Sequence, residues 1–161
     1  MTESMTFTAG PEEVAAELLW QAGFDQLDQF RVESQGGTWE FAGGKLHVDC
    51  VDKRGVTIWL TRDVPTDLIV DYAGTCYPPS TGRNFNLFFC ARGRGGRSMA
   101  EETELSGKYQ LYHELPNYIF TLTCGHTRMR RDPGFLEQSE LMLGSVDQHR
   151  YRIQVIKRGR R

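Results

Sequence analysis

The sequence predicts an all-β fold of antiparallel strands, and three observations lead to this prediction. Glycine is frequent, with 17 in the 161 residues. Short runs of aromatic and β-branched residues recur along the chain, and turn-forming pairs such as Gly36-Gly37 and Gly43-Gly44 separate them. Helical patterns of about 10 to 15 residues do not alternate with these runs, as they would in an α/β protein. An antiparallel sandwich or barrel is therefore expected.

The elements are expected in the following order. A short helix covers residues 11–21, PEEVAAELLWQ, because proline begins it and acids fill its first turn. An alternative is a partly extended segment, since Leu18-Leu19-Trp20 runs straight into Gly23. Ten strands follow, each a β-prone run that ends at a turn signal. They cover residues 30–34, 38–41, 45–50, 56–61, 68–75, 85–91, 109–113, 118–124, 127–131 and 151–157.

Length and composition indicate one globular domain at residues 24–161, preceded by an N-terminal segment at residues 1–23. The chain is 39% hydrophobic and 25% charged, as is usual for a globular domain. Its net charge is −2, but the bases gather late: residues 121–161 carry nine bases and four acids. A nucleic-acid-binding domain usually has a basic excess throughout. Nucleic acid is therefore not an expected partner.

The N-terminal residues do not resemble a signal peptide, because they have no basic start and acids interrupt their only apolar run. No apolar run approaches the roughly 20 residues that a membrane-spanning helix needs. We therefore expect a cytoplasmic protein without a membrane partner.

The four cysteines, Cys50, Cys76, Cys90 and Cys124, lie far apart, with no Cys-x-x-Cys pair and no histidine at zinc-finger spacing. The favoured interpretation is four buried thiols. A zinc site built from distant ligands has no support from the spacing. We expect neither a metal nor a cofactor.

The run RNFNLFFCAR contains two amides that a sugar ligand could use. Because side chains alternate along a strand, Asn84, Asn86 and Phe88 share one face. Amides would bind sugar hydroxyls, and the aromatic ring would contact the apolar face of a pyranose. The alternative, equally favoured for Asn86, is that these amides satisfy neighbouring backbone groups.

Aromatic and titratable side chains supply further candidates. Tyr112, His113 and Tyr118 lie close together in sequence, and His113 could transfer protons because its ordinary pKa lies near neutrality. The alternative for His113 is a structural role at the end of a strand. Trp59 alternates with Thr57 and Thr61, so it could line a groove, although a core position is at least as well supported.

The stretch TRMRRDPGF gathers three arginines before a Pro-Gly turn. On a strand, Arg128 and Arg130 share a face, and two guanidinium groups are well suited to bind a carboxylate, phosphate or sulfate. The alternative is an internal partner, with Asp71, Asp132 or Glu137 as candidates. A ligand that supplies the missing charge would be acidic, for example a uronic acid.

Glycoside hydrolysis usually needs two carboxylates about 5 to 9.5 Å apart. No expected strand contains acid-x-acid, the local pattern that would place two carboxylates at this spacing. A pair assembled from different strands is left open.

The whole pattern resembles the YesU-like, concanavalin A-like jelly-roll proteins of bacteria. The resemblance covers residues 24–161, and its most specific pieces are NFNLFF, the YH…NYI…T segment and the R-x-R-R-x-P-G-F turn. These relatives are domains of unknown function linked to polysaccharide utilisation. The resemblance implies two curved antiparallel sheets with a saccharide on a concave face. It carries no established catalytic residues; its motifs contain Asn84, Asn86, Tyr112, His113, Tyr118, Arg128 and Arg130.

Relatives continue with a further hairpin and closing strands, whereas this chain stops at RGRR. The resemblance thus implies a sandwich without its last strands, or a fragment. An exposed sheet edge could then pair two copies into a homo-oligomer.

Three functions remain open at this point. The first is a jelly roll that binds or processes an acidic, uronate-containing oligosaccharide. The second is a lyase-like enzyme in which Tyr112 or His113 accepts a proton while Asn86 and Arg128 or Arg130 stabilise the developing charge. The third is a non-catalytic protein-interaction sandwich.

Overall fold

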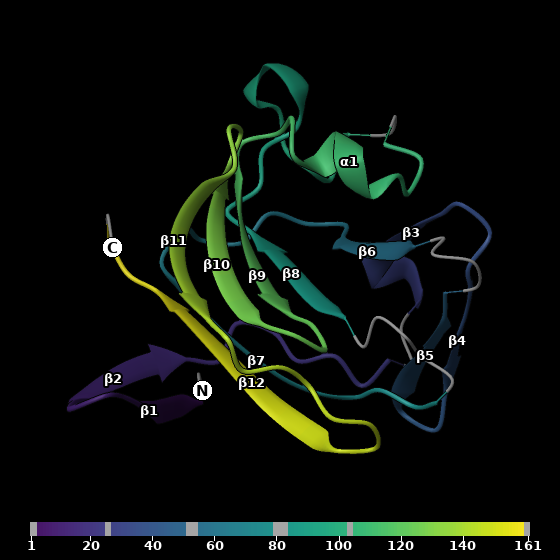
Figure 1. The fold of residues 1–161 in the computed structure, drawn as a ribbon. Coiled ribbons are helices and arrows are strands. Elements are labelled where there is room, and N and C mark those ends of the chain that lie inside the picture. Colours follow the sequence, from purple (N-terminus) through teal and green to yellow (C-terminus); the bar gives the residue numbers. More distant parts are fainter. Residues whose placement is uncertain (1–2, 25–26, 51–54, 79–83, 103–104, 160–161) are drawn as a thin grey trace.

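The computed structural model describes residues 3–24, 27–50, 55–78, 84–102 and 105–159 (Figure 1). Every strand pairing in this part of the chain is antiparallel, which confirms the all-β prediction. The strands are β1 (Ser4–Ala9), β2 (Glu12–Glu17), β3 (Phe30–Ser34), β4 (Thr38–Ala42), β5 (Lys45–Asp49), β6 (Val56–Leu60), β7 (Leu68–Thr75), β8 (Phe85–Phe89), β9 (Asn117–Leu122), β10 (Thr127–Asp132), β11 (Leu136–Leu141) and β12 (Arg150–Lys157). The helical elements are η1 (Leu27–Gln29), η3 (Arg94–Gly96) and α1 (Tyr109–Tyr112).

A curved four-stranded sheet in the order β11-β10-β9-β8 is the largest sheet in the described chain. One of its faces packs against the β7–β12 pair, where Phe89 and Leu122 meet Ile153 and Val155 in a buried cluster. These two layers form the β-sandwich. The opposite face, which we call the inner face, is concave in Figure 1 and looks toward β6 and α1.

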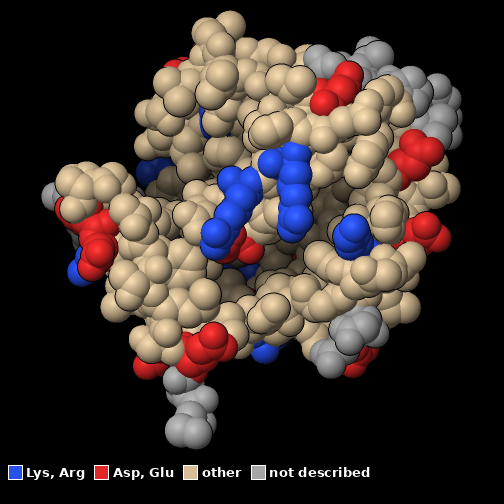
Figure 2. Space-filling view, turned by 90° about the horizontal axis from the view of Figure 1, so that it is seen from below, with Lys and Arg blue, Asp and Glu red and all other residues tan. Residues whose placement is uncertain are grey.

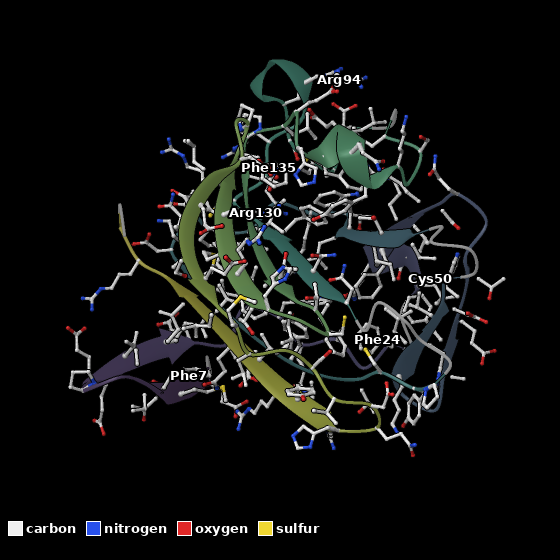
Figure 3. All side chains as sticks on the ribbon, in the orientation of Figure 1. Phe7, Phe24, Cys50, Arg94, Arg130 and Phe135 are labelled. Atoms are coloured by element: carbon white, nitrogen blue, oxygen red, sulfur yellow. The ribbon has the colours of Figure 1, made fainter. Side chains whose placement is uncertain are left out.

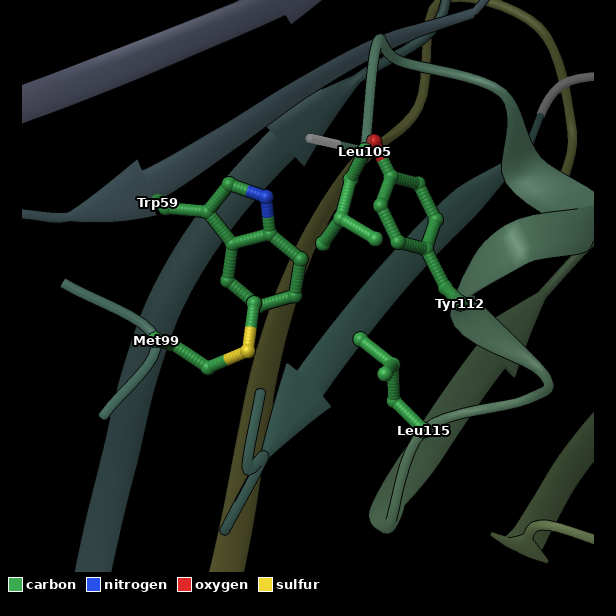
Figure 4. Packing of buried hydrophobic residues seen from close by; sticks show 5 residues of the cluster. All are labelled: Trp59, Met99, Leu105, Tyr112 and Leu115. Carbon is green, nitrogen blue, oxygen red and sulfur yellow. The ribbon is translucent and has the colours of Figure 1, made fainter. Parts of the chain in front are cut away.

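A second buried cluster lies between the inner face, β6 and α1 (Figure 4). It contains Trp59, Met99, Leu105, Tyr112 and Leu115, and Phe88 of β8 packs against it. Burying each large apolar side chain contributes about 1.5–3 kcal/mol, so this cluster holds α1 over one end of the sheet. The four-stranded sheet therefore has a hydrophobic core on each side.

The expected strands from residue 30 onward are largely confirmed. Those at residues 30–34 and 68–75 match β3 and β7, and β4, β5, β6, β8, β9, β10 and β12 differ from prediction by at most two residues at an end. β8 ends at Phe89 rather than at residue 91 because Cys90 adopts a positive φ of 51°, which extended backbone does not allow.

The helix expected at residues 11–21 is wrong. Glu12–Glu17 forms β2, which pairs with β1 and places Phe7 opposite Val14. Gly10 has a φ of 61°, and this left-handed conformation lets the chain reverse between the two strands. Pairing with β1 thus overrides the helix propensity of an Ala- and Glu-rich segment.

Two further expectations differ from the structure. Residues 109–113 were expected as a strand, but Tyr109–Tyr112 forms α1, because helical spacing lets Tyr112 and Leu115 enter the same core cluster. β11 was not predicted, since all six of its residues are exposed and no apolar face marks it.

The expectation of four buried thiols is also wrong. Cys50 and Cys124 are exposed, Cys76 and Cys90 are partly buried, and none of these described cysteines forms a disulfide. Both exposed thiols lie just beyond strand ends, Cys50 after β5 and Cys124 after β9.

No helix among the described residues combines the length and the apolar character needed to cross a membrane. The edges of the four-stranded sheet are β11 and β8. Homo-oligomer formation along such an edge stays a prediction.

Candidate functional site

The inner face brings together polar side chains from three adjacent strands. Thr121 of β9 lies opposite Asn86 of β8 and opposite Arg128 of β10. Two residues earlier on β9, Ile119 lies opposite Phe88 of β8 and opposite Arg130 of β10. Because side chains alternate, Arg128 and Arg130 share a face of β10, as their spacing predicted. The pairing of β10 and β8 with β9 puts Asn86 on the same face.

A cluster of five residues, which we call the Arg130 cluster, lies where this face meets α1. Its members are Tyr109, His113, Arg130, Asp132 and Phe135. The Arg130 guanidinium donates a hydrogen bond to the Tyr109 hydroxyl at 2.9 Å and lies 4.0 Å from the centre of the Phe135 ring. Figure 3 shows Arg130 and Phe135 on the concave side of the sheet.

His113 and Asp132 form a hydrogen-bonded pair within this cluster. The distance from Nδ1 of His113 to Oδ2 of Asp132 is 2.8 Å, and the Asp132 side chain is fully buried. Its other carboxylate oxygen accepts the backbone N–H of Phe135 at 3.1 Å. The rings of Tyr109 and Phe135 pack against the imidazole, with centroids 4.6 and 4.8 Å away. The orientation of His113 is thus held from three sides.

Arg130 is the unusual member of the cluster, because its charge is buried without an acid. Only 5% of the residue is exposed, and no ion pair joins it to a carboxylate among the described residues. Its Nε has no hydrogen-bond partner in the same part of the chain. A buried cation normally has an anionic partner, because desolvating it alone is costly.

Arg128, in contrast, has internal partners. Its Nε lies 2.9 Å from Glu140 and 3.4 Å from Glu137, and a second guanidinium nitrogen also bonds to Glu140. The alternative of an internal acid is therefore confirmed for Arg128, with Glu137 among the acids named. The prediction that Arg128 faces a ligand anion is wrong, since β11 already supplies two carboxylates.

Two predicted site residues belong to the core instead. Trp59 is 7% exposed and Tyr112 is fully buried, and Leu105 packs with both (Figure 4). Both donate hydrogen bonds to Oε2 of Glu33, at 3.2 Å from the indole and 2.7 Å from the phenol. Neither offers a free polar group to a ligand, because both bond to Glu33 within the core cluster.

The remaining candidate residues, Asn86, Tyr118 and Asn84, lie outside the Arg130 cluster. Asn86 accepts a hydrogen bond from the Thr121 hydroxyl at 2.8 Å, so its partner is a side chain on the inner face. The prediction that Tyr118 belongs to the ligand site is wrong. Its ring stacks on Phe89 with centroids 5.4 Å apart, and it packs against the core between the four-stranded sheet and the β7–β12 pair. Asn84 is exposed and precedes β8, so it lies outside the sheet.

Sequence reasoning missed Tyr109 and Phe135 as site residues. Tyr109 and His113 are four residues apart, which places them on one side of a helical turn but not of a strand. Phe135 follows the Pro-Gly turn and adopts a φ of 59°, which turns the chain back and brings its ring over Arg130. Reading residues 109–113 as helical would have revealed the first of these signals.

The glycine-rich loop that follows β8 carries an acid that pairs with groups of the same loop. Glu102 is fully buried, accepts the backbone N–H of Arg94 at 2.8 Å and lies 3.8 Å from Arg97. No group of His, Cys, Asp and Glu side chains within the described ranges could hold a metal ion.

Comparison with known proteins found no matching family model, curated protein or solved structure.

Proposed function

We propose that this chain is a carbohydrate-binding β-sandwich of the YesU-like jelly-roll type, and that its inner face binds a uronate-containing oligosaccharide. The observation that carries the proposal is the buried Arg130, which is without an acidic partner among the described residues. A ligand carboxylate would supply the counter-charge.

The chemistry around Arg130 favours a carboxylate on a sugar over a bare anion. A guanidinium binds a carboxylate through two parallel hydrogen bonds, and Nε is the donor that still lacks a partner. The Phe135 ring is 52% exposed beside it and offers an apolar surface to a pyranose. Farther along the same face, the partly buried Asn86 carries an amide, a group that can bond to sugar hydroxyls.

On the face shown in Figure 2, the charges do not form a continuous basic strip that could bind a long polyanion. Blue and red side chains are interspersed on the face shown in Figure 2. On the outer layer, Arg152 pairs with Asp71 at 2.6 Å, so this base already has an acid. An uncompensated guanidinium at one place recognises a single carboxylate, as a uronate residue provides.

Calorimetric titration with a trigalacturonate and with its neutral methyl ester tests this function. We expect the wild-type protein to bind the acid and to bind the ester at least about 30-fold more weakly, because losing one partner of a buried charge pair costs about 2–5 kcal/mol. Equal affinity for acid and ester would contradict a role for the carboxylate.

Variants locate the site. Arg130→Gln should bind trigalacturonate as weakly as the wild-type protein binds the methyl ester. Arg152→Gln, which removes an exposed arginine paired with Asp71, should bind trigalacturonate with wild-type affinity. Far-UV circular dichroism checks that both variants are folded. Normal binding by a folded Arg130→Gln protein would move the site elsewhere.

A further inference from the structure

We propose that the Arg130 cluster also catalyses β-elimination on a uronate residue, with His113 as the base and Tyr109 as the proton donor. This inference rests on the proposed function, since the substrate is the bound uronate. It reassigns the proton-transfer role from the buried Tyr112 to Tyr109, which lies beside both His113 and Arg130.

His113 has the geometry of a base whose orientation is fixed by an acid. Asp132 is deeply buried and accepts from Nδ1, so Nδ1 carries the proton and Nε2 of the neutral ring carries the lone pair. The side chain is 16% exposed, so part of His113 is accessible from outside. A histidine held in this way has the fixed orientation that a general base needs.

Arg130 makes the proton beside a carboxylate easier to remove. The C5–H bond of a uronate is adjacent to its carboxylate, and removing that proton places negative charge on the carboxylate oxygens. A guanidinium bound to those oxygens stabilises this charge in a water-poor environment. The 5% exposure of Arg130 provides such an environment.

Tyr109 completes the set because its hydroxyl bonds to Arg130 and its ring lies against His113. It accepts a hydrogen bond from Arg130 at 2.9 Å, and this leaves its own proton free to be donated. Its ring lies edge-on to His113 with centroids 4.6 Å apart. A phenolate formed here would be stabilised by the neighbouring guanidinium.

The acids of this face favour elimination over hydrolysis. Hydrolysis needs two available carboxylates, but Glu137 and Glu140 pair with Arg128. Asp132 is occupied by His113 and by the backbone of Phe135. Elimination needs instead one base, one acid and one cation, which the cluster contains.

The step is balanced without a further reactant. Nε2 of His113 removes the C5 proton, the electron pair forms the C4=C5 double bond, and the C4–O4 bond breaks. The leaving O4 takes the proton of the Tyr109 hydroxyl. Transfer of the proton from the His113 imidazolium to the Tyr109 phenolate then restores both groups.

Three trimeric uronates, of galacturonate, mannuronate and glucuronate, serve as probes, each followed by calorimetry and by the ultraviolet absorbance of the unsaturated product. We expect wild-type protein to release unsaturated product from at least one of them. His113→Asn should bind that trimer but form the unsaturated product at least about 100-fold more slowly, as loss of a general base does. His149→Asn, which changes an exposed histidine outside the cluster, should leave the rate unchanged.

The outcomes separate the two proposals. Binding of a trimer with no absorbance change from any of the three overturns elimination and leaves the binding function intact. Binding of none overturns both. Full activity in His113→Asn or in Tyr109→Phe overturns the assigned roles.

Asp132 is a positioning residue in this scheme, since it acts through His113. Asp132→Asn should lower kcat while KM stays near the wild-type value, because the substrate contacts remain and only the imidazole orientation changes. A loss of stability alone would reduce the amount of folded protein and leave kcat per folded molecule unchanged, which would contradict the role.

Discussion

Glu33 shows how one buried acid organises the core cluster beneath α1. It is 8% exposed, accepts hydrogen bonds from Tyr112 and Trp59, and lies 3.3 Å from Arg31. Burial raises the pKa of the Tyr112 hydroxyl well above its ordinary value, so this group stays protonated and donates to Glu33. The network thereby ties α1 to β3 and β6.

Replacing Tyr112 by phenylalanine tests this network. Tyr112→Phe keeps the ring but leaves Glu33 with one donor fewer, so we expect the free energy of unfolding to fall by about 1–3 kcal/mol. Tyr77→Phe, at a 67% exposed position, should change it little. Urea denaturation of the two variants measures both values, and equal stability would mean that the Glu33 hydrogen bond contributes nothing.

The cysteines allow a second measurement on single residues. Partial burial raises the pKa of the Cys90 thiol, which also donates to the Thr66 carbonyl at 3.6 Å, so less of it is the reactive thiolate. Cys50 and Cys124 are exposed. Native protein should therefore react with a thiol-labelling reagent first at Cys50 and Cys124, as peptide mass spectrometry would show. Labelling of Cys90 at the same rate would contradict this order.

Sequence reasoning found part of the candidate site. Strand alternation placed Arg128 and Arg130 on one face of their strand, because that relation depends only on spacing. That Asn86 lies on the same face follows from the pairing of β8, β9 and β10, which the sequence does not show. Strand alternation did not reveal which arginine has an internal acid, since β11 carries Glu137 and Glu140 on a strand with no apolar pattern. Pairings between distant strands decide such contacts, and local sequence does not encode them.

At the scale of elements, the predictable strands are those with a buried face. β7 and β12 carry alternating apolar residues into the sandwich core, and their ranges were found to within one residue. β1 and β2 lack this feature: apart from Phe7, their side chains are exposed or only partly buried. Their strand structure comes from pairing with each other, which composition alone does not show.

The β1–β2 hairpin should accordingly be much less protected from hydrogen exchange than the strands of the four-stranded sheet. It pairs with no other strand of the described chain, and an isolated two-stranded hairpin is marginally stable in water. β9 lies between β8 and β10 and should be the best protected. Hydrogen exchange followed by mass spectrometry compares them, and equal protection would show that other contacts hold the hairpin.

The β7–β12 pair predicts a pH dependence of stability. Gln154 lies opposite Asp71 and Arg152 diagonally across from it, and the Arg152 hydrogen bonds hold the pKa of Asp71 below its ordinary value. Because the folded-state pKa is the lower one, the pair stabilises the fold above the ordinary carboxyl range. That contribution is lost as the pH falls through the folded-state pKa.

Urea denaturation of wild type and Asp71→Asn at two pH values checks this sign. The variant should be less stable than wild type at neutral pH, and the difference should shrink as the pH falls below the ordinary carboxyl range and the wild-type carboxyl becomes protonated. A difference that stays constant with pH would show that the charge of Asp71 is unimportant.

At the scale of the whole molecule, the four-stranded sheet joins two cores. Phe88 faces the buried cluster of Trp59, Met99, Leu105, Tyr112 and Leu115, which we call the Trp59 cluster. The adjacent Phe89 faces Ile153 and Val155 of β12. The sheet can therefore not lose one core without disturbing the backbone that carries the other. This arrangement supports the prediction that residues 24–161 form one folding unit.

One substitution in each core tests that unit. Leu115→Ala leaves a cavity in the Trp59 cluster, and Leu122→Ala leaves a cavity in the cluster that contains Ile153 and Val155. Each should lower the free energy of unfolding by about 2–5 kcal/mol. For a single unit, tryptophan fluorescence and far-UV circular dichroism should give coincident urea transitions in wild type and in both variants. If Leu115→Ala shifted the fluorescence transition alone, the Trp59 cluster would unfold on its own, and the chain would contain two units instead of one.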